Sequence, residues 1–173
     1  LLYTRFITMV FHDWKLIGFE EPFVKFRTHG LVTKDGAKMS KSKGNVVSPD
    51  TYIRVYGRDA VRMYLAFLAP FDQGGDFRDT GIRGITRFLD RVWKFADRDK
   101  IPFAIQKNSD IESLVHKTVK KVTEDIEELR YNTAIASLMV CLNEFEKNSK
   151  TITAEQLNIF LRLLAPFAPY ITE

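Results

Sequence analysis

The most informative stretch of this sequence is eight residues long: Lys38-Met39-Ser40-Lys41-Ser42-Lys43-Gly44-Asn45. The stretch has neither helical nor strand periodicity, so we expect a loop. Its ammonium groups, hydroxyls and exposed backbone N–H groups suit a polyphosphate, and its glycine permits close approach of the backbone. The composition alone also fits a solvated surface loop or a basic localisation patch. The order of the residues and their surroundings must decide between these interpretations.

The residues before the loop predict a helix followed by a strand. Apolar residues recur at helical spacing over residues 1–17, and Gly18 follows as a candidate C′ residue. Residues 23–32 are rich in aromatic and β-branched side chains, which favours a strand. Asp35-Gly36 then indicates a hairpin turn. The loop is therefore expected to follow a strand and a tight turn.

Two short helices are predicted directly after the loop. Ser48-Pro49-Asp50 places a side-chain acceptor at the cap, a proline at the first helical position and an acid near the positive end of the helix dipole. Gly57 is expected to end this helix, and a second should cover residues 59–68. The side chains that the second helix should bury are Ala60, Val61, Tyr64, Leu65 and Leu68. Residues 70–75 are expected to form a loop.

Beyond Gly81 the pattern is helical throughout. The first apolar stripe consists of Ile82, Ile85, Leu89, Val92 and Trp93. The second consists of Ile111, Leu114, Val115, Val122, Ile126 and Leu129. Behind an Asn132 cap, the third consists of Ile135, Leu138, Met139, Leu142 and Phe145, with Cys141 as a core thiol. Thr153 and Gln156 form a capping box for a fourth helix. Four amphipathic helices joined by short connections imply a bundle.

One face of the first bundle helix is basic. Its cations follow one another at spacings of three or four residues: Arg83, Arg87, Arg91, Lys94 and Arg98. Such a stripe, about 20 Å long, can track nucleic-acid phosphates without contacting bases, and binding of that kind weakens with salt. The alternative is a solvated helix face whose charges pair with Asp90 and Asp97.

Composition limits the class of protein. The chain has 173 residues, an apolar fraction of 45% and fourteen Phe residues, which fits a packed globular protein. A single cysteine excludes an internal disulfide framework, and the net charge of +4 is modest. No apolar run approaches the ~18 residues of a membrane span, and nothing indicates a signal peptide. We therefore expect a cytoplasmic protein that does not bind membranes.

The order of residues 38–45 and the context around them resemble the second signature of class I aminoacyl-tRNA synthetases. His29-Gly30-Leu31-Val32 and an Asp-Gly turn precede the signature, and a Ser-Pro-Asp cap follows it. Valyl, isoleucyl, methionyl and cysteinyl enzymes share this loop, so the flanks must indicate the member. The segments that resemble leucyl enzymes are residues 1–6, 56–62, 81–93, 132–134 and 164–169.

The resemblance implies a mainly helical fold in three parts. Residues 1–47 would be the end of a Rossmann-type catalytic domain carrying the loop. Residues 48–80 would be a helical linking segment. Residues 81–173 would be a truncated α-helical bundle of the anticodon-binding type. In leucyl enzymes this bundle touches the body of the tRNA, which fits the basic stripe.

The resemblance also implies an activity and its site residues. A monomeric parent enzyme would convert leucine, with ATP and Mg2+, to leucyl-adenylate and pass the leucyl group to tRNA(Leu). Lys41 would bind ATP, supported by Lys38 and the hydroxyls of Ser40 and Ser42. Met39 would pack against the protein and tether the loop. No metal ligands are assigned in this chain.

Other parts of such an enzyme are not in the sequence. The first class signature, a His-x-Gly-His-like element, is absent, as are the leucine pocket, the adenine site and the editing domain. We therefore expect the segment alone to be inactive. Two alternatives stay open: a segment of a valyl or isoleucyl enzyme, or a stand-alone tRNA-binding module whose binding is weak and electrostatic.

Overall fold

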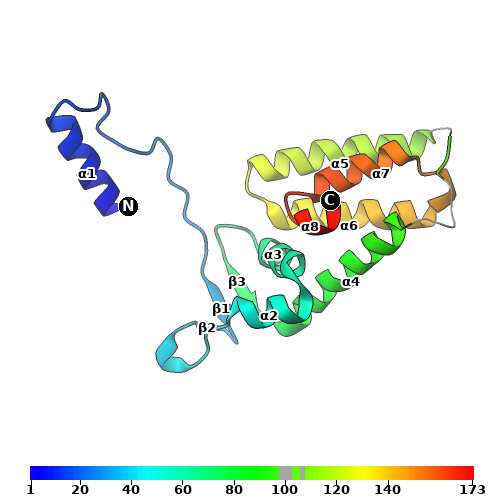
Figure 1. Cartoon of the computed structure of the whole chain (residues 1–173), viewed down its shortest axis with the longest axis horizontal. Coiled ribbons are helices and arrows are strands. Elements are labelled where there is room, and N and C mark those ends of the chain that lie inside the picture. Colours follow the sequence, from blue (N-terminus) through cyan, green and yellow to red (C-terminus); the bar gives the residue numbers. More distant parts are fainter. Residues whose placement is uncertain (98–102, 106–107) are drawn as a thin grey trace.

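The computed structural model of the chain describes residues 1–97, 103–105 and 108–173. Helices dominate these residues, so the mainly helical class predicted from the sequence is confirmed. Figure 1 shows the second half of the chain gathered into a helical body, next to a small sheet. None of the helices in the described ranges is long and apolar enough to cross a membrane.

The first helix, α1 (Leu2–Asp13), lies apart from the helical body (Figure 1). It ends earlier than predicted because Lys15 adopts a left-handed conformation with φ 59°. The Leu16 N–H then donates to the carbonyl oxygen of Phe11 at 2.9 Å, which closes the helix end. The prediction of Gly18 as the C′ residue was wrong. Apolar side chains of this helix, such as Leu2 and Phe6, are exposed.

The loop is attached to a three-stranded sheet. Its strands are β1 (Val32–Lys34), β2 (Ala37–Lys38) and β3 (Gly75–Phe77), in the order β2-β1-β3. β1 and β2 form the predicted hairpin, with φ 54° at Asp35 and 73° at Gly36, as a type I′ turn requires. β3 pairs with β1 in parallel and was not predicted. The strand predicted over residues 23–32 was wrong except at its last residue.

Two helices follow the loop: α2 (Pro49–Tyr56) and α3 (Arg58–Phe67). Gly57 ends α2 as predicted, at φ 85°, but Ser48 makes no side-chain capping bond. α3 buries Ala60, Val61 and Tyr64 as expected. The prediction for Leu65 was wrong because 47% of this residue is exposed, and Met63 is fully buried in its place.

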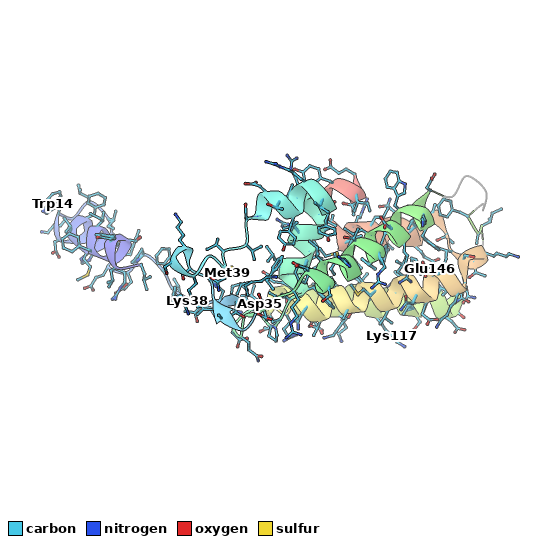
Figure 2. All side chains as sticks on the ribbon, turned by 90° about the horizontal axis from the view of Figure 1, so that it is seen from below. Trp14, Asp35, Lys38, Met39, Lys117 and Glu146 are labelled. Carbon is cyan, nitrogen blue, oxygen red and sulfur yellow. The ribbon has the colours of Figure 1, made fainter. Side chains whose placement is uncertain are left out.

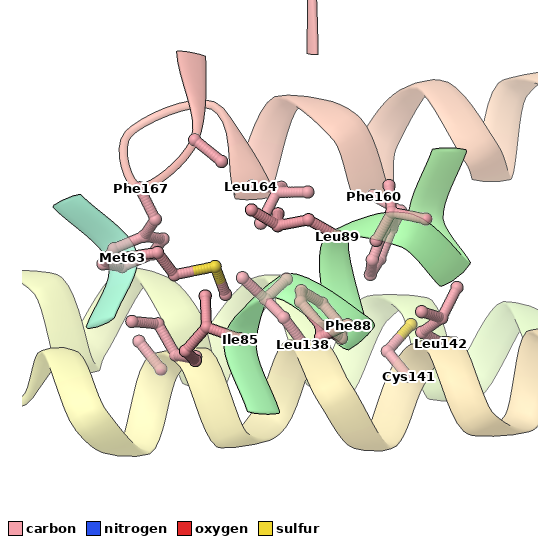
Figure 3. Close-up of a cluster of buried hydrophobic side chains, with 14 of the residues drawn as sticks. Met63, Ile85, Phe88, Leu89, Leu138, Cys141, Leu142, Phe160, Leu164 and Phe167 are labelled. Carbon is pink, nitrogen blue, oxygen red and sulfur yellow. The ribbon is translucent and has the colours of Figure 1, made fainter. Parts of the chain in front are cut away.

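The predicted bundle is confirmed. Its elements are α4 (Asp79–Ala96), α5 (Ser109–Glu127), α6 (Tyr131–Lys147), the 3₁₀ helix η2 (Ser149–Thr151), α7 (Ala154–Leu164) and α8 (Pro169–Thr172). Figure 3 shows α3 joining this core through Met63, which lies near Phe167 and Ile85. The side chain of Cys141 is also buried, and burial raises the pKa of its thiol to about 11. The capping box of Thr153 and Gln156 is present.

Two predictions for the bundle helices were wrong. Trp93 is 59% exposed, and Phe88 faces the core instead. Residue 88 precedes Leu89 and Val92 by one and four positions, so a helix places it on their buried side. Asn132 does not cap α6, whose N-cap is Arg130.

The corner between α5 and α6 is held by a buried carboxylate. Asp125 accepts hydrogen bonds at 2.8 Å from Lys121 Nζ, Arg130 Nε and Thr133 Oγ1. Leu129 supplies the turn with φ 59°. Burial would raise the pKa of the Asp125 carboxyl, but the three hydrogen bonds outweigh it and hold the pKa below its usual range.

The segment ahead of β1 is fastened to the helical body by a close backbone crossing. The Gly30 N–H donates to the carbonyl oxygen of Phe71 at 2.8 Å. A Cβ atom on Gly30 would lie 1.9 Å from the backbone nitrogen of Gly74, so only glycine fits there. The ring of Phe71 packs edge-on against Tyr131 at 6.2 Å between centroids. The strand that leads to the loop is thereby connected to the start of α6.

Candidate functional site

The loop after β2 is a closed structure stabilised by its own hydrogen bonds. Residues Lys41–Lys43 form a 3₁₀ helix, η1, whose N-cap Ser40 accepts a bond from the Lys43 N–H through Oγ at 3.3 Å. Gly44 ends η1 in a left-handed conformation, with φ 65°, and its N–H donates to the carbonyl oxygen of Lys41 at 3.2 Å. The loop predicted for these residues is therefore a loop with one ordered turn inside it.

The side chain of Asn45 joins the two ends of the loop. Its Oδ1 accepts a hydrogen bond from the Ser40 N–H at 2.9 Å, and its Nδ2 donates to the carbonyl oxygen of Lys38 at 3.2 Å. Sequence reasoning gave Asn45 no role. The Gly44-Asn45 pair was the only local signal, because an amide beside a left-handed glycine is typical of turns.

The predicted site residues lie on two sides of this loop. Lys38, Lys41 and Ser42 are exposed, whereas Met39 is partly buried and packs against the core. Ser40 is half-buried, and its Oγ lies 3.2 Å from Ser42 Oγ. Figure 2 shows Lys38 and Met39 next to the hairpin turn at Asp35. In Figure 1 the loop projects away from the helices, so its cations are accessible to a ligand.

The first of two carboxylates near the hairpin is hydrogen-bonded to the hairpin itself. Asp76 Oδ1 accepts hydrogen bonds from the Gly36 N–H at 2.9 Å and from Thr33 Oγ1 at 3.0 Å. The Gly36 bond and then Arg78 hold the pKa of Asp76 below its usual range. Asp76 therefore fixes the turn that leads into the loop.

A second carboxylate links the hairpin to the helices behind it. Tyr52 of α2 donates its hydroxyl proton to Asp79 Oδ1 at 2.5 Å, and Lys34 Nζ lies 3.5 Å from the same oxygen. The hydrogen bond to Asp79 raises the pKa of Tyr52 to about 12 and lowers that of Asp79. Asp79 is thus occupied with supporting the hairpin, as Asp76 is.

The basic stripe divides into two kinds of residue. Arg83, Arg87 and Lys94 are exposed on α4. Arg91 instead forms an ion pair with Glu146 of α6 and donates to Asn143 Oδ1 at 2.6 Å. Arg91 therefore connects two bundle helices. Arg98 lies outside the described residues.

Comparison with known proteins identifies the class. The family described as "tRNA synthetases class I (I, L, M and V)" matches residues 2–77, and "Anticodon-binding domain of tRNA ligase" matches residues 108–173. The chain belongs to the class I tRNA synthetases. Within that class it is similar to leucine–tRNA ligases along its whole length.

The similarity to these ligases is close. The chain is 42% identical to the leucine–tRNA ligase of Dehalococcoides mccartyi strain BAV1 and 42% identical to that of Thermotoga maritima, with all of this chain covered in both cases. A solved ternary complex of Agrobacterium radiobacter K84 agnB2 LeuRS with tRNA and LeuAMS matches with a TM-score of 0.86 and 35% identity over 100% of this chain. The chain spans 22% and 23% of the two ligases and 25% of the solved chain.

Proposed function

We propose that this chain is the segment of a leucine–tRNA ligase that supplies the ATP-binding loop and part of a tRNA-contacting helical domain. One observation carries the proposal. The loop of residues 38–45 is closed by its own hydrogen bonds and exposes lysines, in a chain that aligns along its whole length with leucine–tRNA ligases.

The proposed reaction is the activation of leucine. A carboxylate oxygen of leucine forms a bond to the α-phosphorus of ATP, and the bond from that phosphorus to the bridging oxygen breaks. Pyrophosphate leaves with the electron pair of the broken bond. Negative charge develops on the phosphoryl oxygens during this step, so cations placed beside them accelerate the reaction if they bind the transition state better than ATP itself.

In this chain Lys41 is proposed as the main cation, with Lys38 and the hydroxyls of Ser40 and Ser42 in support. The acceptor oxygens of a polyphosphate match the ammonium and hydroxyl donors that the loop exposes. Residues 38–45 contain no carboxylate, so Mg2+ would be bound by the ATP phosphates and would neutralise their charge. The chemistry that the loop itself supplies is charge stabilisation.

The division of the chain is part of the proposal. Residues 1–47 would belong to the catalytic domain, residues 48–80 to a linking segment and residues 81–173 to the helical domain. The close crossing at Gly30 and Gly74 supports a rigid connection between the first two parts. We further propose that the ligase is cytoplasmic and monomeric.

Leucine-dependent ATP–pyrophosphate exchange tests the proposed activity. The full-length enzyme that carries this segment should exchange pyrophosphate with leucine about 10- to 200-fold faster than with valine, because a hydrophobic pocket discriminates against one missing methylene by about that factor. The segment of 173 residues alone should show no exchange. Activity with valine but not leucine would assign the segment to a different ligase of the class.

Binding of tRNA by the helical domain is expected to be electrostatic. If Arg83, Arg87 and Lys94 each neutralise one phosphate, affinity should fall about 40-fold between 50 and 200 mM salt. Arg87→Ala should reduce the salt slope by about one, measured by filter binding at several salt concentrations.

Arg91→Ala is the matched comparison for that experiment. Because Arg91 is paired with Glu146, this change should lower the stability of the bundle and leave the salt slope nearly unchanged. An affinity independent of salt would contradict the proposed contact.

A further inference from the structure

We propose that Asn45 is a positioning residue that sets the ATP-binding loop in its reactive conformation by bonding its side-chain amide to the backbone on both sides of Met39. The proposal rests on the proposed function, because the loop acts on ATP only in that case. Asn45 does not touch the phosphates in this role. It acts through the backbone of Lys38 and Ser40, to which it is hydrogen-bonded.

The geometry resembles the pairing of a β-strand. In a parallel pair of strands, a residue of one strand bonds with its N–H and C=O to the two backbone groups that flank one residue of the other strand. Asn45 does the same with its amide: Nδ2 donates to the Lys38 carbonyl oxygen at 3.2 Å, and Oδ1 accepts from the Ser40 N–H at 2.9 Å. Since β2 ends at Lys38, this side chain takes over where the strand pairing stops.

The closure orients the side chains of the loop. Between the two bonded backbone groups, Met39 packs against the core. Directly after them, Ser40 starts η1 and bonds to the Lys43 N–H, so Lys41 and Ser42 emerge on the exposed turn. A change at Asn45 should therefore displace these donors without removing any of them.

The cost of such a displacement should appear in catalysis. A mobile loop can still find the phosphates of bound ATP, but holding donors against the transition state then requires ordering the loop during the reaction. Loss of the two Asn45 hydrogen bonds should thus lower kcat while changing the KM for ATP little.

The amide also restricts which residues can substitute. The side chain at position 45 must carry both a donor and an acceptor. It must also be long enough to reach the backbone groups on both sides of Met39. Asn45→Ala removes both groups. Asn45→Asp keeps the acceptor for the Ser40 N–H but replaces the donor with an oxygen that faces the Lys38 carbonyl. Asn45→Gln keeps both groups on a longer arm and should restore part of the activity.

The experiment compares these three variants in the full-length ligase that carries this segment. We expect Asn45→Ala and Asn45→Asp to lower kcat for leucyl-adenylate formation about 10- to 100-fold, which is about 1.4–2.7 kcal/mol at 1.36 kcal/mol per decade. KM for ATP should stay within about threefold of the wild type. Asn45→Gln should lie between Asn45→Ala and the wild type. Asn158→Ala, an exposed asparagine on α7, is the matched control and should have no effect.

A second measurement reports on loop closure without relying on activity. The Ser40 amide proton, bonded to Asn45, should exchange with solvent faster than in the wild type when measured by NMR. Asn45→Ala lacks the acceptor, and in Asn45→Asp repulsion between the carboxylate and the Lys38 carbonyl oxygen should displace it. If the wild-type enzyme is active, an unchanged kcat in both variants would overturn the proposal. A higher KM for ATP with an unchanged kcat would also overturn it.

The two proposals fail in different ways. A wild-type enzyme without leucine-dependent exchange would overturn the proposed function and, with it, the catalytic part of this inference. Unchanged exchange of the Ser40 amide in both variants would overturn the closure by Asn45, whatever the activity. If Asn45→Ala does not fold, Asn45→Asp carries both readouts.

Discussion

Replacing Lys41 with alanine is expected to slow leucyl-adenylate formation about 100- to 1000-fold, the range seen when one donor that stabilises developing charge is removed. Lys41 is exposed at the start of η1, on a turn whose backbone is already hydrogen-bonded. Its ammonium group can therefore follow the charge that moves onto the phosphoryl oxygens. Single-turnover measurements of adenylate formation by the full-length ligase, with saturating leucine and ATP, give the rate.

Variants of two other lysines serve as controls that test whether the effect is specific to Lys41. Lys43→Ala changes a neighbouring exposed lysine at the edge of the loop, and we expect less than about a fivefold change, because a solvated charge there contributes little. Lys117→Ala removes a cation on α5, far from the loop in Figure 2, and should have no effect. An unchanged rate of adenylate formation in Lys41→Ala would show that Lys41 does not take part in the reaction.

Replacing Asp125 with alanine is expected to lower the free energy of unfolding of the bundle by about 2–4 kcal/mol. The carboxylate is completely buried and accepts three hydrogen bonds from residues on α5, the turn and α6. Its loss leaves Thr133 without this acceptor and leaves Lys121 and Arg130 close together without the charge between them. Urea unfolding followed by circular dichroism at pH 7 measures the change.

The same pair of proteins should show a defined pH dependence. The pKa of Asp125 is lower in the folded chain than in the unfolded one, so its contribution is complete above the unfolded value of about 3.9 and is lost as the pH falls through the folded value. The difference between wild type and Asp125→Ala should therefore shrink in acid. Glu127→Ala, at an exposed position of α5, should differ from wild type by less than about 0.5 kcal/mol at any pH. A difference that does not change with pH would mean that Asp125 acts by packing alone.

Local signals explain what the sequence could predict. The Asp35-Gly36 turn was predictable because two consecutive positive φ angles favour these residue types. The helices of the bundle were predictable because an apolar stripe with a helical period needs no knowledge of its partner. The capping box at Thr153 and Gln156 is another signal contained within four residues.

The features that could not be predicted depend on residues that are distant in sequence or on a conformation that exists only in the folded chain. β3 has only three residues, and its partner β1 lies more than forty positions earlier, so no periodicity could indicate it. The aromatic and β-branched residues over 23–31 satisfy strand propensity but have no strand partner among the described residues. The two bonds of Asn45 exist only once the loop has turned at Gly44. The role of Arg91 likewise depends on α6 lying beside α4.

The buried thiol of Cys141 has a practical consequence for labelling. It is the only cysteine in the 173-residue chain, it is 1% exposed, and its raised pKa keeps the reactive thiolate scarce at neutral pH. Thiol-directed dyes should therefore leave the folded segment unmodified. A cysteine introduced on the exposed side of the loop would then carry a fluorophore selectively, with no need to remove the native residue from the core.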